Sequence, residues 1–196
     1  MDWGVATRPI AGETVSGDLH LVQPFDHGVL LAAIDGLGHG KEAVAAARAA
    51  VAVLRKHPGE PVVQLIQRCH EALMETRGAV MTVASLHASN GPMTWLGVGN
   101  VECRLLHADP HAGQASDSVL LRGGVVGYQL PVLHPRAVSV APGDLLIFAT
   151  DGIRADFANG LSLGQTPGQI AIHILNQHFK GTDDGLVLVV RYLGMP

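Results

Sequence analysis

The sequence is organised around one stretch, Val29-Leu30-Leu31-Ala32-Ala33-Ile34-Asp35-Gly36-Leu37-Gly38-His39-Gly40. Six apolar residues run directly into Asp35, and glycines follow at alternate positions before a helical pattern begins. An uninterrupted apolar run of this length predicts a strand buried on both faces. Asp35 is therefore expected where a buried strand reaches the surface, beside glycines whose backbone adopts conformations closed to other residues. A carboxylate held at that place is either a turn residue or a metal ligand.

A second strand is predicted just before this one, over residues 19–23, and a turn follows over residues 24–28. An antiparallel hairpin with its turn centred between Asp26 and His27 places Asp18 opposite Asp35. Residues directly opposite each other have Cβ atoms about 5 Å apart, and like charges there repel. The register therefore favours a cation between the two carboxylates.

Length and composition limit the possible classes of protein. A chain of 196 residues, 47% of them hydrophobic, fits a single globular domain over residues 1–196. No apolar run is long enough to span a bilayer, and the first residues do not have the pattern of a signal peptide. The net charge of -4 gives no reason to expect nucleic acid as a partner. Two cysteines make neither a disulfide framework nor a zinc motif, so a cytoplasmic location is expected, with Cys69 in the core.

The remaining pattern predicts an α+β fold with antiparallel sheet, because strands and helices do not alternate regularly. Residues 80–107 read as a meander of three strands joined by turns. Thr166 is expected to cap the last helix, with Pro167 in its first turn. The helices are predicted over residues 39–57, 61–77 and 166–179, and the further strands over residues 5–9, 80–87, 93–98, 101–107, 119–121, 145–150 and 186–190.

The chain has eleven histidines, of which His107 and His111 flank Asp109-Pro110. A metal site is one interpretation of this spacing. A surface loop is favoured, because the stretch is polar and contains proline and glycine. His39 is the histidine placed near Asp35 in the sequence.

Acidic residues stand at the ends of several predicted strands. Asp35 and Asp151 each end a buried strand, whereas Asp18 and the pair Asp183-Asp184 each precede one. Neighbouring antiparallel strands start and end at the same edge, so these positions are expected to converge on one rim of the sheet. Asp-Gly is also a common turn dipeptide, which gives each position a purely structural alternative. Taken together, the carboxylates suit two hard cations, Mg²⁺ or Mn²⁺, about 3.5–4 Å apart.

The ordered set of motifs resembles the metal-dependent type 2C serine/threonine protein phosphatases, in particular the SpoIIE-like bacterial branch. The short length and the Arg77-Gly78-Ala79 sequence are most similar to the feedback phosphatases of the stressosome, which are bare catalytic domains. The motifs occur in family order over nearly the whole chain: Ser16-Gly17-Asp18, Asp35-Gly36-Leu37-Gly38-His39-Gly40, Val98-Gly99-Asn100, Thr150-Asp151-Gly152 and Asp183-Asp184.

The resemblance implies an α-β-β-α sandwich of two mainly antiparallel sheets flanked by helices, with two Mn²⁺ or Mg²⁺ ions at one end. Asp35 corresponds to the bridging ligand, and Gly36 contributes its backbone carbonyl. Asp151 and Asp183 correspond to further ligands of one ion, and Asp184 serves beside Asp183 or in its place. The remaining acidic residue, Asp18, corresponds to the residue that faces the second ion, either directly or through water.

The chain also departs from the family pattern. The more distant animal members have a histidine where this chain has Leu37, and His39 lies two residues further on. The family's phosphate-binding arginine has no clear counterpart, and Arg8, the one guess for it, is better explained as a surface arginine. Asp35 and Asp151 are the residues expected to carry catalysis, through a water activated by the metals.

The predicted function is hydrolysis of phosphoserine or phosphothreonine on partner proteins. The resemblance implies that these are STAS-domain stressosome proteins, dephosphorylated in feedback control of stress signalling in the cytoplasm. One alternative is a phosphatase-like protein-binding module whose turnover is weakened. Another is a hydrolase of small phosphorylated metabolites.

Overall fold

The computed structural model describes residues 1–87, 91–109 and 115–194. His111 lies outside these residues. The elements follow the chain as β1 (Asp2–Arg8), β2 (Asp18–Phe25), β3 (Gly28–Gly36), α1 (Gly40–Lys56), α2 (Val62–Leu73), β4 (Ala79–His87), β5 (Met93–Val98), β6 (Glu102–Leu106), β7 (Ser116–Ser118), β8 (Leu121–Arg122), β9 (Arg136–Val138), β10 (Leu145–Ala149), α3 (Pro167–His178) and β11 (Gly185–Arg191).

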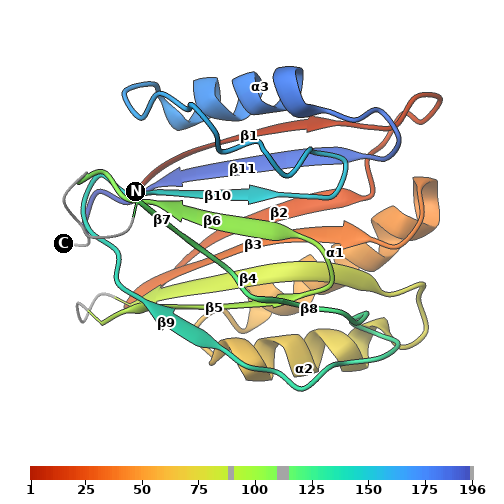
Figure 1. Ribbon diagram of the computed structural model, residues 1–196. Helices are drawn as coiled ribbons and strands as arrows, with labels where there is room; N and C mark the ends of the chain where they lie inside the picture. Colours follow the sequence, from red (N-terminus) through yellow and green to blue (C-terminus); the bar gives the residue numbers. More distant parts are fainter. Residues whose placement is uncertain (88–90, 110–114, 195–196) are drawn as a thin grey trace.

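Two sheets pack face to face, and helices cover both outer faces (Figure 1). One sheet has the order β1-β11-β10-β6-β7, and the other has the order β2-β3-β4-β5-β8 with β9 also paired to β5. Helix α3 covers the first sheet, whereas α1 and α2 cover the second. Separate apolar layers fill the space under α3, between the sheets, and under α1 and α2. The predicted α-β-β-α sandwich is confirmed.

The β2–β3 hairpin has the predicted register. Its paired residues run from Phe25 opposite Gly28 to Asp18 opposite Asp35. A slip of one residue would move every buried side chain of β3 to the other face of the sheet. The packing of these side chains therefore holds the register. The hairpin therefore sets two carboxylates side by side at one end of the sheet.

The predicted meander over residues 80–107 is wrong in its last strand. Strands β4 and β5 pair as expected, but β6 pairs with β10 in the other sheet. Gly99, with a φ of 91°, turns the chain between the sheets, and its amide donates to the carbonyl of Arg122. Residues 116–122 likewise form two short strands in different sheets, β7 and β8, instead of one strand over 119–121.

Helix α1 begins very close to the end of β3. A Cβ atom at Gly36 would lie 2.0 Å from the carbonyl oxygen of Ala43, so only glycine permits this approach. Thr166 caps α3 as predicted: its side chain accepts from the amide of Gln169, whose own side chain accepts from the amide of Thr166. Among the described residues, no helix is long and apolar enough to cross a membrane.

His107 directly follows β6, at the start of the predicted loop, and is partly buried. Its ring lies between two carboxylates, with Nδ1 3.0 Å from Asp144 Oδ2 and Nε2 3.0 Å from Asp117 Oδ2. Burial disfavours the charged ring, but the hydrogen bonds to both aspartates outweigh it and raise the pKa of His107 above its ordinary value. Asp144 precedes β10 and Asp151 follows it, so this cluster lies at the opposite end of the strand from the acidic rim.

Candidate active site

The structure brings the five acidic residues together at one end of the sandwich. Asp18 opens β2 and lies opposite Asp35 at the end of β3, in the second sheet. Asp151 follows β10, and Asp183-Asp184 precedes β11, in the first sheet. Because β10 and β11 are antiparallel neighbours, the end of one meets the start of the other. The site therefore lies across the open edge between the sheets.

The carboxylates are close enough to change one another's ionisation. Burial, reinforced by the negative charges of Asp18, Asp151 and the Asp183-Asp184 pair, raises the pKa of Asp35 to about 9. Burial also raises the pKa of Asp18 to about 7. The hydrogen bond from Thr150 lowers this pKa, and the negative charges of Asp151 and the Asp183-Asp184 pair raise it further. The pKa of Asp151 is raised by burial and by Asp183. Such mutual repulsion is relieved by a cation placed among the groups.

The donor set fits a hard divalent ion. All five side chains offer oxygen, and among the described residues none donates a hydrogen bond to the Asp35 carboxylate. As the side chains stand, no group of three or more His, Cys, Asp or Glu within the described chain is arranged to hold an ion. Oxygen-only ligands favour Mg²⁺ or Mn²⁺ over zinc.

Asp183 and Asp184 have different surroundings. Asp184 is buried, and its two oxygens accept from the amides of Ile10, at 2.7 Å, and Gly17, at 2.6 Å. It thus fastens the loop that leads into Asp18. Asp183 is half-buried and lines the cleft, and within the described residues its one hydrogen-bond donor is the adjacent amide of Asp184.

Three residues contact the acidic side chains or their backbone, and the sequence did not predict these contacts. The Thr150 hydroxyl donates to Asp18 Oδ2 at 2.7 Å and accepts from the amide of Leu186, which links the two sheets. Asn100 Nδ2 donates to Asp151 Oδ2 at 2.9 Å, and Lys180 Nζ donates to the Asp151 carbonyl at 2.6 Å. Thr150 and Asn100 belong to motifs noted in the sequence, and this membership could have marked them as site residues. No feature of the sequence distinguishes Lys180.

A cleft of about 440 Å³ opens over the carboxylates. A second hollow of about 340 Å³ lies on the far side of Asp151 and includes Lys180. The two hollows share Asn100 and Asp151. The residues lining the cleft are Asp35, Leu37, Gly38, Val80, Gly99, Asn100, Gly123, Gly124, Val125, Asp151 and Asp183.

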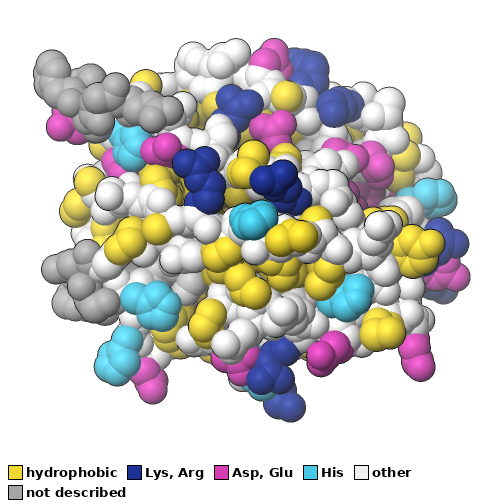
Figure 2. Space-filling model, turned by 60° about the horizontal axis from the view of Figure 1, so that its bottom comes forward, with side chains coloured by type: hydrophobic (Ala, Val, Ile, Leu, Met, Phe, Trp, Pro, Cys, Tyr) yellow, Lys and Arg dark blue, Asp and Glu magenta, His cyan; other side chains and the backbone are white. Residues whose placement is uncertain are grey.

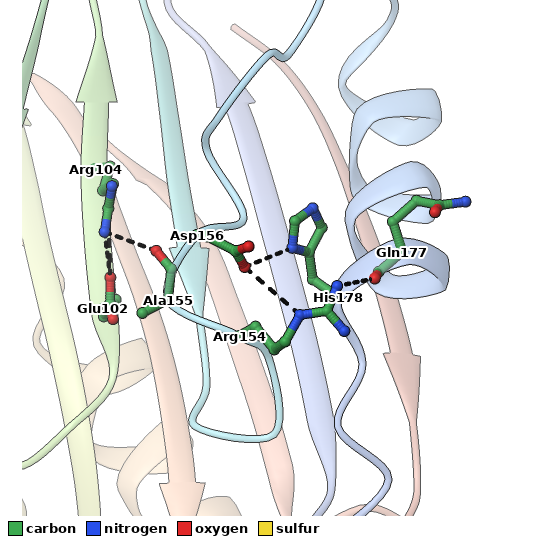
Figure 3. A network of polar contacts seen from close by, with 7 residues as sticks. All are labelled: Glu102, Arg104, Arg154, Ala155, Asp156, Gln177 and His178. Atoms are coloured by element: carbon green, nitrogen blue, oxygen red, sulfur yellow. Dashed lines mark hydrogen bonds and ion pairs between the residues drawn. The ribbon is translucent and has the colours of Figure 1, made fainter.

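Figure 3 shows how the chain after Asp151 is fastened beside the site. Arg104 of β6 donates to the carbonyl of Ala155, and the Arg104 guanidinium also lies over the ring of Phe157. On the α3 side, Asp156 pairs with His178 at 2.9 Å. These contacts come from both neighbouring elements, so they hold the segment that follows Asp151 in a fixed position.

Two residues considered from the sequence lie outside the cleft lining. His39 precedes α1, where its Nδ1 lies 2.8 Å from Glu13 Oε1. The Arg8 guanidinium donates to Asn176 and lies over the ring of Phe179. Leu37, which lies two residues after Asp35, does line the cleft.

Residues 26–165 match the family described as Stage II sporulation protein E (SpoIIE). The phosphoserine phosphatase RsbX of Bacillus subtilis (strain 168) is 25% identical over 183 residues, which cover 93% of this chain and 89% of RsbX. The crystal structure of RsbX in complex with magnesium has a TM-score of 0.82, 23% identity, and coverage of 94% of this chain and 92% of that chain.

A chain from a structure of the bacterial stressosome, described as a modular system adapted to control secondary messenger signalling, is also similar. It has a TM-score of 0.86 and 30% identity, and the match covers 97% of this chain and 98% of that chain. The similarity to these proteins therefore extends over nearly the whole sandwich.

Proposed function

The chain belongs to the SpoIIE family of PP2C-type protein serine/threonine phosphatases, and we propose that it hydrolyses phosphoserine or phosphothreonine on partner proteins with the help of two divalent cations. The observation that carries the proposal is the acidic cluster at one end of the sandwich, where Asp35, Asp151 and Asp183 line the cleft and Asp18 lies opposite Asp35 in the β2–β3 hairpin. Such a cluster is costly to fold without a cation, and a cation is what phosphoryl transfer at this fold requires.

The residues that would hold the ions are Asp35, with the Gly36 carbonyl, together with Asp151 and Asp183. Asp18 would face the second ion. Asp183 is preferred over Asp184 as the proposed metal ligand, because both carboxylate oxygens of Asp184 already accept backbone amides. When bound, two such ions supply positive charge for the phosphoryl oxygens and lower the pKa of water.

The chain's own residues hold this arrangement in place. The amide of Asn100 fixes one oxygen of Asp151, and Lys180 fixes the carbonyl of the same residue. Thr150 fixes one oxygen of Asp18. Within the described part of the chain, the cleft lining includes no Ser, Thr, Cys or His side chain, so we expect direct attack by water and no phosphoenzyme on those residue types.

The partners we propose are phosphorylated STAS-domain proteins of the stressosome, dephosphorylated in feedback control of stress signalling. This follows from the similarity to RsbX and to a chain from a stressosome structure. We further propose that residues 1–196 act as one catalytic domain in the cytoplasm, and the net charge of -4 gives no electrostatic reason to expect nucleic acid or an anionic membrane as a partner.

The direct test is manganese- or magnesium-dependent phosphate release from para-nitrophenyl phosphate and from a serine-phosphorylated STAS-domain protein. Asp35→Ala and Asp151→Ala should lose activity while circular dichroism shows an intact fold. Asp2→Ala, at the far end of β1, is the matched control and should retain activity. Unchanged turnover in Asp35→Ala or Asp151→Ala contradicts the two-metal assignment.

One alternative is a phosphatase-like module that binds partners with little turnover. Two observations favour it: Leu37 stands at the position of the family histidine, and the described acidic side chains are not yet arranged around an ion. Calorimetry with Mn²⁺ separates the alternatives, since the module would bind partner proteins without binding the metal or releasing phosphate.

A further inference from the structure

Three large hydrophobic side chains are exposed close to the cleft. Tyr128, Val132 and Met74 are 83%, 75% and 65% exposed, and these are the highest values for large hydrophobic residues in the described chain. Figure 2 looks onto the lower face of Figure 1, where α2 and the chain after β8 run, and shows hydrophobic side chains exposed there beside Lys, Arg and His side chains. We call the three residues, with Arg77 and Arg122, the Tyr128 surface.

Close packing holds this surface in place. A Cβ atom at Gly127 would lie 2.7 Å from Leu73 Cβ, so the chain before Tyr128 lies directly on the end of α2, next to Met74. A Cβ atom at Gly124 would lie 2.7 Å from Pro131 Cδ, which brings the residue before Val132 against the cleft wall. The exposed side chains are therefore presented by a rigid backbone.

The inward residues of the same segment explain why the others point outward. Val126 is fully buried, and Leu130 and Leu133 pack on the core beneath α1 and α2. The amides of Val125 and Gln129 each donate to the other's carbonyl at 2.8 Å, which closes the turn that carries Tyr128. Val126, Leu130 and Leu133 therefore pack into the core, whereas Tyr128 and Val132 between them are exposed to solvent.

The surface is continuous with the cleft. Gly123, Gly124 and Val125 line the cleft wall, and Tyr128 follows three residues later. The Arg77 guanidinium lies against Gly38 on the same cleft, 2.8 Å from where a Cβ of that glycine would be, and it pairs with Glu42. Arg122 is exposed directly before Gly123.

We propose that the Tyr128 surface binds the polypeptide that flanks the phosphorylated residue of a protein substrate, with an apolar side chain of that polypeptide against Tyr128 and Val132. The inference rests on the proposed function. A phosphorylated segment fits this surface for two reasons. Its phosphate would enter the acidic cleft together with the cations, and negative charge elsewhere on the segment would face Arg77 and Arg122. Exposed aromatic and apolar residues beside a functional cleft are typical of a recognition surface.

The test compares wild type with the double variant Tyr128→Ser/Val132→Ser on two kinds of substrate. These are para-nitrophenyl phosphate and a set of phosphoserine peptides that carry either leucine or serine next to the phosphorylated residue. We expect wild type to prefer the leucine peptides by about tenfold in kcat/KM, and we expect the double variant to lose this preference. Hydrolysis of para-nitrophenyl phosphate should be unchanged, because neither residue lines the cleft.

Ile172→Ser is the matched control, since Ile172 is 55% exposed on α3 in the opposite helical layer. It should keep the peptide preference. Arg122→Gln should weaken peptide hydrolysis through KM with little change in kcat.

Three results would overturn the inference. The first is a wild type without peptide preference, and the second is a double variant that slows both kinds of substrate equally. The third is a wild-type dimer in sedimentation that the double variant dissociates with unchanged peptide kinetics, which would assign the surface to a second copy of the chain. A wild type that hydrolyses neither kind of substrate overturns the proposed function itself, and the inference with it.

Discussion

Asp183 and Asp184 are adjacent in the sequence, yet the structure surrounds them differently, so Asp183→Ala and Asp184→Ala should separate activity from stability. The Asp184 carboxylate is only 3% exposed and accepts two backbone amides, at 2.7 Å from Ile10 and 2.6 Å from Gly17. Asp183 is half-buried and accepts only the neighbouring amide.

The magnitude follows from the two amides that lose their acceptor. A buried amide without a partner costs about 1–3 kcal/mol, so the loss of the acceptor for two amides in Asp184→Ala should lower the free energy of unfolding by about 2–6 kcal/mol. For a domain of this size that corresponds to a fall of roughly 10 °C in Tm. Asp184→Asn keeps one oxygen acceptor and should lose about half as much. Asp183→Ala should change stability by less than about 1 kcal/mol, because its position is partly solvated.

Activity should change in the opposite order. Loss of a partner that merely orients a ligand costs about 10–100-fold, so if Asp183 is a ligand as proposed, its loss should cost at least about 100-fold in kcat/KM. Asp184→Asn should retain most of the activity at a temperature below its Tm. Urea denaturation and metal-dependent phosphate release on the same preparations make the comparison. A stable, inactive Asp184→Asn, or a destabilised and active Asp183→Ala, would refute the reasoning.

Three further predictions concern other parts of the molecule. Asn100→Ala should weaken Mn²⁺ binding by about tenfold in calorimetry, because the Asp151 carboxylate loses the amide that orients it; unchanged affinity would remove its positioning role. The raised pKa of His107 means that the folded state holds a proton more tightly than the unfolded chain, so its stabilising contribution should be full below about pH 6 and should be lost as the pH rises through the raised pKa. Urea denaturation across this range should show a slope that His107→Gln abolishes. Gly36→Ala should destabilise the fold by about 3 kcal/mol or more, because its Cβ would lie 2.0 Å from the Ala43 carbonyl oxygen, and a Tm within a few degrees of wild type would contradict this close approach.

Local sequence patterns predicted most of the elements and one long-range pair. Apolar runs marked the strands, and the confirmed pairing of Asp18 with Asp35 followed from counting outward from the turn. The confirmed cap at Thr166 depended only on residues within one helical turn. The resemblance carried by the ordered motifs is confirmed for the family, the fold and the class of enzyme. The assignment of individual ligands stays a prediction.

The errors lie where partners are chosen across the fold. Residues 101–107 have the pattern of a strand, but no feature of that pattern reveals that β6 pairs with β10 of the other sheet. His107 lies at the start of the predicted loop, but its sequence neighbours did not reveal that β7 and the residue before β10 bring Asp117 and Asp144 to its ring.

The sequence by itself determined where strands end in aspartate, because burial periodicity and turn chemistry are local properties of the chain. The tertiary structure decided what each carboxylate does there. Asp183 lines the cleft and Asp184 accepts two backbone amides, although both occupy the same motif, because the turn before β11 places one carboxylate at the cleft and the other beneath the loop that leads into Asp18. The contacts of Asn100, Thr150 and Lys180 with the cluster likewise arise only when separate strands meet at one end of the sandwich.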